Sequence, residues 1–188
     1  MTTPTPPVRL RALRALALVA FACAATAAPA AVKDATPAGF TIENSVVVPV
    51  DADAAWRGLV GEIDRWWPRD HTWWGADSTL SIEPRAGGCL CEKAGAREAW
   101  HMSVTHVDPG ALLRMTGGLG PLQGMGVHGA LEWRFAAAEG GTRITLHYRV
   151  GGYTPDDLSK FAPVVDRVQA QQLGALATHL GAARPPKP

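Results

Sequence analysis

The sequence lacks several features that would assign it to a common functional class. It has no run of lysine and arginine, and its 18 basic residues almost balance its 17 acidic ones, so nucleic acid is not an expected partner. Beyond the N-terminus it contains no apolar run of the roughly 20 residues that span a bilayer, so no integral membrane span is expected after processing. It also has no internal repeat and no low-complexity block. These absences leave a chain of the usual size for one domain with one core.

Cysteine is scarce, with three residues in the chain. Cys89 and Cys91 have no second pair and no close-spaced histidine to accompany them, so we predict no metal site. Two residues apart on a regular strand, their Cα atoms would be about 6.6 Å apart, at the long limit of disulfide geometry. A bridge would need a bulge or turn, for which Gly87 and Gly88 offer flexibility. The alternative is two buried thiols that pack as small apolar residues.

The N-terminus has the three-part order of a secretory signal peptide. Three arginines within residues 9–14 precede the apolar run 15–21, and a run of small residues follows over 24–31. Small residues near the end of such a segment mark the cleavage site. We therefore predict a cleaved signal peptide over residues 1–28, with cleavage near Ala28 or Ala30.

Two alternatives exist for this segment. A membrane anchor would need a longer apolar run. A lipoprotein signal at Cys23 fits less well because the bulky Phe21 lies where that signal usually has a small residue. Removing residues 1–28 takes away three arginines and no acid, which leaves 15 basic and 17 acidic residues. We expect a slightly acidic protein that is periplasmic or secreted.

The first half of the mature chain predicts one strand and one helical region. Residues 29–39 are small and aperiodic, which predicts a linker. Residues 40–48 are β-rich and predict a strand. Asp51 then offers a helix N-cap, and apolar residues recur at helical spacing until Pro68, with Trp56 on the buried stripe.

From residue 78 the pattern changes to short β segments separated by Gly, Pro and Asp. A hairpin turn at 139–141 joins the last two segments. In the last one, Ile144, Leu146, Tyr148 and Val150 alternate with polar residues, so one face of the sheet is buried. The six predicted segments are 78–83, 89–93, 98–107, 112–116, 130–135 and 142–150.

After Pro155 the helical period returns and continues to about residue 180. Gln172 interrupts an otherwise apolar stripe, and Pro163 must lie in the first turn because a proline further inside would break the helix. Residues 183–188 are expected to be a disordered tail, which leaves 40–182 as the domain. The stripe consists of Phe161, Val165, Val168, Gln172, Leu176 and His179 or Leu180.

This order of elements predicts an α+β protein with a helix-grip fold. A curved antiparallel sheet of about seven strands would wrap around the long C-terminal helix, and one or two short helices would follow the first strand. A helix that packs across a concave sheet tends to leave a cavity between them.

Several motifs give the chain a family resemblance. It resembles the START-like, birch-pollen-allergen-like helix-grip superfamily (SRPBCC), and it is most similar to the bacterial branch called polyketide cyclase/dehydrase-like. The similarity runs from about residue 40 to the end of the last helix. The motifs are Trp66-Trp67-Pro68 with His71-Thr72 and Gly75, Gly87-Gly88-Cys89-Leu90-Cys91-Glu92, Gly118-Leu119-Gly120-Pro121-Leu122-Gln123, Gly151-Gly152-Tyr153-Thr154-Pro155, and Val165-Asp166.

The resemblance implies a hydrophobic internal cavity for lipids, polyketides, sterols or other small apolar molecules. It does not imply one catalytic apparatus, because members include carriers, cyclases and ring-hydroxylase domains with iron and zinc sites. The iron–sulfur ligand pattern of that last group is absent here, and we expect no cofactor.

Tryptophans are concentrated in one part of the chain. Five of the seven lie within residues 56–74, and Trp66, Trp67, Trp73 and Trp74 frame one histidine. Large rigid rings beside Pro and Gly, outside any regular apolar period, favour the lining of a concave site. Ordinary packing of this connector onto the sheet is the alternative. We predict that these four tryptophans contact a ligand.

His71 is the predicted polar group inside this aromatic surround. It could relay a proton or hold a ligand oxygen, or it could brace the loop by bonding a backbone carbonyl.

Glu92 should face away from the two cysteines, where it could act as a base or lie in solvent. His101 and His106, five residues apart, would lie on opposite faces of a regular strand, which argues against a shared metal.

Residues 117–126 form a Gly-rich apolar stretch. It is not a nucleotide-binding P-loop, because no Lys-Ser/Thr follows the glycines and no helix opens after them. A lid over the cavity or a mobile strand connection fits better. The predicted ligand contacts here and on the neighbouring strand and rim are Leu119, Leu122, Met125, Tyr148 and Tyr153.

The leading hypothesis is an exported domain that binds a small hydrophobic or aromatic molecule, with His71 and Gln172 as its polar contacts. The rival is an enzyme of cyclase or dehydratase type that uses His71 and Glu92 as acid and base, which requires both side chains to point into one cavity. A third hypothesis is a protein-interaction module, for which the tryptophans would form a convex surface.

Overall fold

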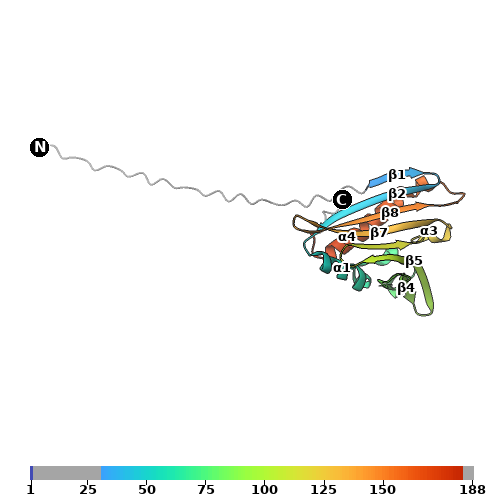
Figure 1. Ribbon diagram of the computed structural model, residues 1–188, viewed down its shortest axis with the longest axis horizontal. Helices are drawn as coiled ribbons and strands as arrows, with labels where there is room; N and C mark the ends of the chain where they lie inside the picture. The colour runs from blue at the N-terminus through green and yellow to red at the C-terminus, as the bar shows by residue number, and fades with distance from the viewer. Residues whose placement is uncertain (2–30, 184–188) are drawn as a thin grey trace.

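The structure is a computed structural model that describes Met1 and residues 31–183. An eight-stranded antiparallel sheet has the order β1-β2-β8-β7-β6-β5-β4-β3, and the long helix α4 crosses one of its faces (Figure 1). The predicted helix-grip fold is confirmed. The strands are β1 Ala31–Thr36, β2 Gly39–Val48, β3 Thr79–Ile82, β4 Cys89–Ala94, β5 Arg97–Asp108, β6 Leu112–Thr116, β7 His128–Ala138 and β8 Gly141–Gly151. The helices are α1 Ala52–Gly61, α2 Ile63–Trp66, α3 Pro121–Gly124 and α4 Ala162–His179, with the 3₁₀ turns η1 Arg69–His71, η2 Gly75–Asp77 and η3 Leu158–Lys160.

The sheet has one strand more than the pattern indicates. Residues 31–36, which the sequence assigns to a linker, form β1 and pair antiparallel with β2. This segment has no apolar alternation, and its extended form depends on hydrogen bonds to the edge of β2. The predicted signal peptide beyond Met1 and residues 184–188 of the predicted tail lie outside the described residues.

The short helices α1 and α2 close one end of the molecule. The Asp51 carboxylate accepts a hydrogen bond from the Ala54 N–H at 2.7 Å, which confirms the predicted N-cap. Trp56 is buried and its ring packs edge-on against Phe135, with the centroids 5.9 Å apart. The run ends at Trp66, just before Pro68, because a proline cannot continue the hydrogen-bond pattern.

Helix α4 packs along β2 and meets α1 and α2 near its end. Pro163 lies in its first turn, as predicted. Its sheet-facing side carries buried polar residues, and the Asn44 side-chain N–H donates to the Asp166 carboxylate at 3.0 Å. None of the helices in the described part of the chain is long and apolar enough to cross a membrane. The helix therefore covers the sheet through a mixed apolar and polar face.

Candidate functional site

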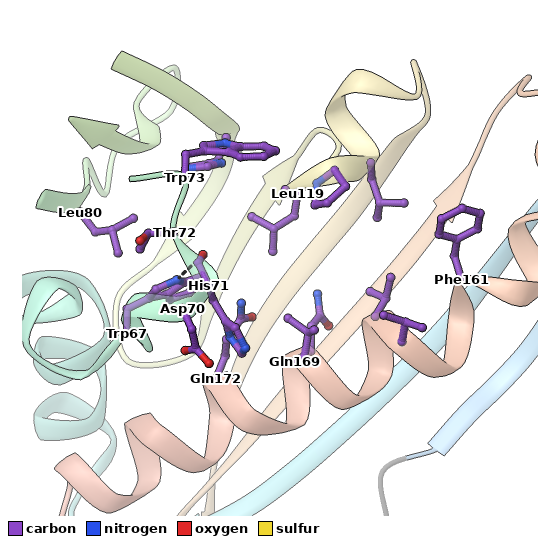
Figure 2. Close-up of a pocket in the computed structure, with 17 residues that line it drawn as sticks. Trp67, Asp70, His71, Thr72, Trp73, Leu80, Leu119, Phe161, Gln169 and Gln172 are labelled. Carbon is purple, nitrogen blue, oxygen red and sulfur yellow. Dashed lines mark hydrogen bonds between the residues drawn. The ribbon is translucent and has the colours of Figure 1, made fainter. Parts of the chain in front are cut away.

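A cavity of about 400 Å³ lies between α4, the connector around η1 and the Gly-rich loop before α3. Figure 2 shows Phe161, Gln169 and Gln172 on the α4 side, and Trp67, His71 and Trp73 on the connector side. Its walls are mostly apolar. The lining residues are Trp67, Asp70, His71, Thr72, Trp73, Leu80, His101, Leu119, Gly120, Pro121, Leu122, Phe161, Val164, Val165, Val168, Gln169 and Gln172.

The tryptophan cluster divides between the cavity and other surroundings. Trp67 and Trp73 line the cavity; Trp67 is buried and Trp73 is 47% exposed. Trp66 and Trp74 do not line it, which corrects the prediction for these two. Trp66 is buried between Trp67 and Trp133 and donates its indole N–H to the Gly58 carbonyl, so it belongs to the core. The Trp74 ring lies under the Arg97 guanidinium at 5.3 Å instead.

Glu92 is fully buried but does not line the cavity. One of its oxygens accepts hydrogen bonds from the Ser78 hydroxyl at 2.5 Å and from the N–H groups of Trp73 and Trp74 at 2.8 and 3.3 Å. The other oxygen is 2.8 Å from Nε2 of His101. Burial raises the pKa of Glu92, but the bonds from Ser78, His101 and Trp73 outweigh it, so the net pKa lies below the ordinary value.

This environment corrects the predicted pairing of His71 with Glu92. A carboxylate held by four donors behind the cavity wall is not free to act on a bound molecule. His71 does line the cavity, and Trp67 donates its indole N–H to the His71 backbone carbonyl. The His71 Nδ1 is buried without a partner in the described residues, so that atom makes no bracing bond to a backbone carbonyl.

His101 is a cavity residue that sequence reasoning missed. Leu90 pairs with Met102, but Cys91 pairs with Trp100, so His101 is an extra residue in β5 opposite one residue of β4. Such a bulge re-aims side chains, and here both His101 and the neighbouring Met102 are buried. Regular alternation would separate these two neighbours onto opposite faces of the sheet, and nothing in the sequence marks the bulge.

Four buried polar atoms that belong to cavity-lining residues have no hydrogen-bond partner among the described residues. They are Nδ1 of His71, Nδ1 of His101, and both amide atoms of Gln169. Buried polar groups in folded proteins are almost always paired, so four exceptions at one cavity need an explanation. A bound molecule with its own polar groups would supply the missing partners.

The Gly-rich loop forms one wall of the cavity through Leu119 and Leu122. Met125 packs against the core instead of the cavity. Tyr153 also lies outside the lining and is 91% exposed, because it follows the end of β8 and points to solvent. Tyr148 does not line the cavity either, which corrects its predicted ligand contact.

Tyr148 anchors the Gly-rich loop through two hydrogen bonds of its hydroxyl group. Its buried hydroxyl donates to the Gly117 carbonyl at 3.0 Å and accepts from the Leu119 N–H at 3.1 Å. Burial raises the pKa of Tyr148 to about 12, and the hydrogen bond from the Leu119 N–H opposes this rise. The phenol therefore stays protonated and keeps both bonds.

Replacing Tyr148 with phenylalanine is expected to lower the free energy of unfolding by about 1–3 kcal/mol, because the Leu119 N–H loses its partner. Amide hydrogen exchange at Leu119 should become faster. Urea denaturation and exchange measured by NMR test both effects. Tyr153→Phe, which removes an exposed hydroxyl, is the matched control and should change stability by less than about 0.5 kcal/mol. Equal effects of the two variants would contradict the assigned role.

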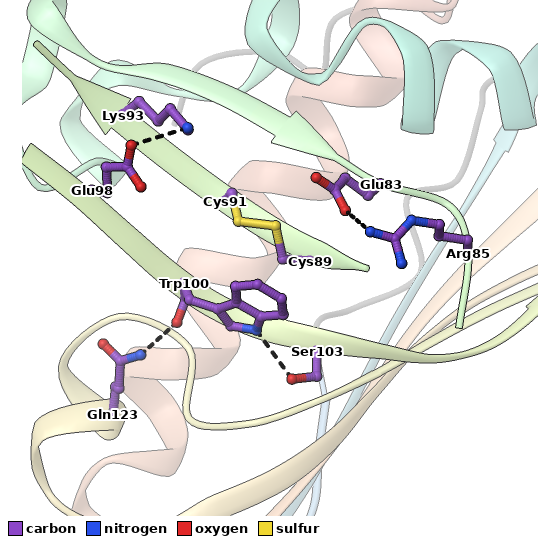
Figure 3. Close-up of a disulfide and its surroundings, with 9 residues drawn as sticks. All are labelled: Glu83, Arg85, Cys89, Cys91, Lys93, Glu98, Trp100, Ser103 and Gln123. Carbon is purple, nitrogen blue, oxygen red and sulfur yellow. Dashed lines mark hydrogen bonds and ion pairs between the residues drawn. A yellow bond between two sulfur atoms is a disulfide. The ribbon is translucent and has the colours of Figure 1, made fainter. Parts of the chain in front are cut away.

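Cys89 and Cys91 form a disulfide, which decides between the two alternatives left by the sequence (Figure 3). Their Cα atoms are 5.4 Å apart, closer than on a regular strand. The irregularity lies opposite the bulge in β5, not at Gly87 and Gly88. The carbonyl of Trp100, the residue before the bulge, accepts a hydrogen bond from the Gln123 side chain of α3 at 2.6 Å. The bulge thus joins the disulfide, the cavity wall and the loop.

Comparison with known proteins agrees with this architecture. The family described as polyketide cyclase / dehydrase and lipid transport matches residues 39–181. The chain belongs to this family. The match confirms the predicted SRPBCC superfamily. The search of curated proteins finds no match to the chain.

Solved structures share the fold at low sequence identity. Protein CV1439 from Chromobacterium violaceum is 16% identical with a TM-score of 0.53, and the alignment covers 76% of this chain and 98% of that one. Ara h 8.0201 is 15% identical with a TM-score of 0.53, covering 76% and 97%. CalU16 from Micromonospora echinospora is 14% identical with a TM-score of 0.50, covering 76% of each chain. At these identities the likeness concerns the fold alone.

Proposed function

We propose that this protein is an exported helix-grip domain that binds a small, mainly apolar molecule, lipid-like, polyketide-like or aromatic, inside the cavity. The observation that carries the proposal is the set of unpartnered polar atoms of His71, His101 and Gln169 in an otherwise apolar lining. Each such atom costs the folded state about 1–3 kcal/mol. An amphipathic guest would satisfy these atoms while it covers the apolar wall.

The two other hypotheses lack support from the site. The enzyme hypothesis needs His71 and Glu92 at one cavity, but Glu92 lies behind the wall. The interaction hypothesis needs a convex patch of tryptophans, but Trp66 and Trp67 are each only 6% exposed.

The direct test is mass spectrometry of small molecules extracted from protein purified from its native compartment. In parallel, the neutral fluorescent probe N-phenyl-1-naphthylamine should bind with increased emission. Val168→Trp, which places an indole in the cavity, should weaken probe binding at least about tenfold. Ala136→Trp adds the same ring on an exposed part of β7 and should leave probe binding unchanged. Absence of both extracted ligand and probe uptake would refute the proposal.

Gln169 offers a sharper test of the unpartnered atoms. Gln169→Leu is expected to raise the free energy of unfolding by about 1–3 kcal/mol, because it removes an amide that has no partner. The same change should weaken binding of an amphipathic ligand. Gln171→Leu, on the exposed side of the same helix, should change stability by less than about 0.5 kcal/mol. Urea denaturation of both variants measures the difference, and a destabilised Gln169→Leu would contradict the account.

Export is supported by the three-part order of the N-terminus and by the Cys89–Cys91 disulfide, since disulfides persist mainly in oxidising compartments. Mature protein from the periplasmic or culture fraction should begin at Pro29 or Ala31. It should take up no alkylating reagent before reduction and two equivalents after it. Intact-mass measurement tests both points, and an unprocessed chain that stays in the cytosol would overturn this part.

A further inference from the structure

His101 and Glu92 form a buried pair at the cavity wall. They are 7% and 0% exposed, and the pair joins β5 to β4. Because a carboxylate can only accept a hydrogen bond, Nε2 of His101 must carry the hydrogen that points to Glu92. In the neutral ring this leaves Nδ1 as a bare acceptor, and Nδ1 is the atom without a partner.

The charges around the cavity restrict what this acceptor could bind. Of the described residues that line the cavity, none is lysine or arginine. A ligand that is already anionic would therefore meet no fixed positive charge there. The other titratable groups of the lining are Asp70 and His71, both on η1, and Asp70 is exposed to solvent. The lining thus favours a molecule that enters neutral.

We infer that His101, held by Glu92, accepts a proton or a strong hydrogen bond from an acidic hydroxyl of the ligand, a phenol or an enol. This inference rests on the proposed binding function and names the chemical class of the ligand. Gln169 supplies one donor and one acceptor to a further polar group of the same molecule.

The proton transfer balances within the site. The O–H bond of the ligand breaks, its electron pair stays on the oxygen, and a new N–H bond forms at Nδ1 of His101. The imidazolium that results is stabilised by the Glu92 carboxylate at 2.8 Å. Glu92 acts only through His101 and is a positioning residue. Beside a mostly apolar lining, where the effective dielectric constant is lower than in water, an oxyanion next to an imidazolium is held far better than in solution.

Two probe molecules of nearly equal shape distinguish proton transfer to His101 from binding without proton transfer. 4-Nitrophenol can give up a proton, and its phenolate has a distinct visible absorption band. 4-Nitroanisole, the methyl ether, cannot. At a pH one unit below the midpoint of free 4-nitrophenol, where roughly a tenth is ionised in solution, the bound probe should be mostly phenolate. This corresponds to a shift of the ionisation equilibrium of at least about tenfold, while 4-nitroanisole should bind without a spectral change.

His101→Gln should still bind 4-nitroanisole but lose the phenolate band, since an amide can bond Glu92 but cannot take a proton. Glu92→Gln should lose most of the phenolate band. If the Glu92 variant does not fold, His101→Gln alone tests whether His101 takes the proton. His106→Gln, which changes an exposed histidine on the same strand, should keep the band.

The inference fails if bound 4-nitrophenol stays neutral or if His101→Gln keeps the band. In both cases uptake of N-phenyl-1-naphthylamine would leave the binding function standing. Failure of both nitro compounds to displace that probe would also overturn the inference.

Discussion

Replacing Glu92 with alanine is expected to lower the free energy of unfolding by about 3–5 kcal/mol, the largest effect of any single polar substitution considered for this protein. The carboxylate joins the backbone N–H groups of Trp73 and Trp74, the Ser78 hydroxyl and the His101 ring. These groups come from the connector, from the residue just before β3 and from the bulge of β5. Its removal leaves several buried donors without an acceptor.

Urea denaturation gives the measurement. Glu92→Gln keeps one acceptor oxygen and should lose less stability than the alanine variant. Glu98→Ala removes a carboxylate whose side chain is 64% exposed in its pair with Lys93, and should change stability by less than about 0.5 kcal/mol. A Glu92→Ala variant as stable as Glu98→Ala would refute the role of Glu92.

The pH dependence of stability follows from the same group. The pKa of Glu92 is lowered on folding, so its contribution is complete above the ordinary value of 4.5 and is lost as the pH falls through the folded-state value. Asp64 and Glu132 also have lowered pKa values and add in the same direction. Denaturation between pH 6 and roughly pH 3 should show a smaller acid-induced loss for Glu92→Gln than for the natural protein.

Trp67→Ala is expected to lower the free energy of unfolding by about 3–5 kcal/mol, whereas Trp73→Ala should cost no more than about 1 kcal/mol. Trp67 is 6% exposed, packs on Trp66 and donates to the His71 carbonyl. The Trp73 ring is about half exposed at the cavity, so its loss removes little core packing and should mainly reduce contact with the proposed ligand.

Denaturation and N-phenyl-1-naphthylamine titration of both variants provide the measurement. Trp73→Ala should bind the probe several-fold more weakly and remain nearly as stable as the natural protein. The reverse order of stabilities would show that the division of the tryptophan cluster is wrong.

The sequence predicts most of the fold because its periodicity records which face of each element is buried. The alternation of Ile144, Leu146, Tyr148 and Val150 in β8 is an example, since all four side chains are buried. The Asp51 cap and the position of Pro163 are equally local signals and were predicted for the same reason. By contrast, β1 exists through pairing with β2, and its own residues carry no strand pattern.

The site is less predictable, because it depends on register and on long-range contacts. Periodicity places His101 on the wrong face, since one extra residue in β5 shifts the alternation. The partners of Glu92 are 9 to 19 residues away, and no spacing rule connects a strand carboxylate to the backbone of a preceding loop. The sequence places Tyr148 on the buried face of β8 and predicts it as a ligand contact, but its hydroxyl bonds the backbone of the Gly-rich loop instead, a partner about 30 residues away that no spacing rule indicates.

The connector that carries Trp73 is held to Glu92 by its main chain and not by its indole. Any residue except proline offers the same N–H at that position. The identity of the side chain there is therefore free to diverge without loosening the connector. Position 73 is thus a natural point for evolution or protein engineering to change the wall of the cavity, and with it the proposed ligand preference, while the scaffold stays intact.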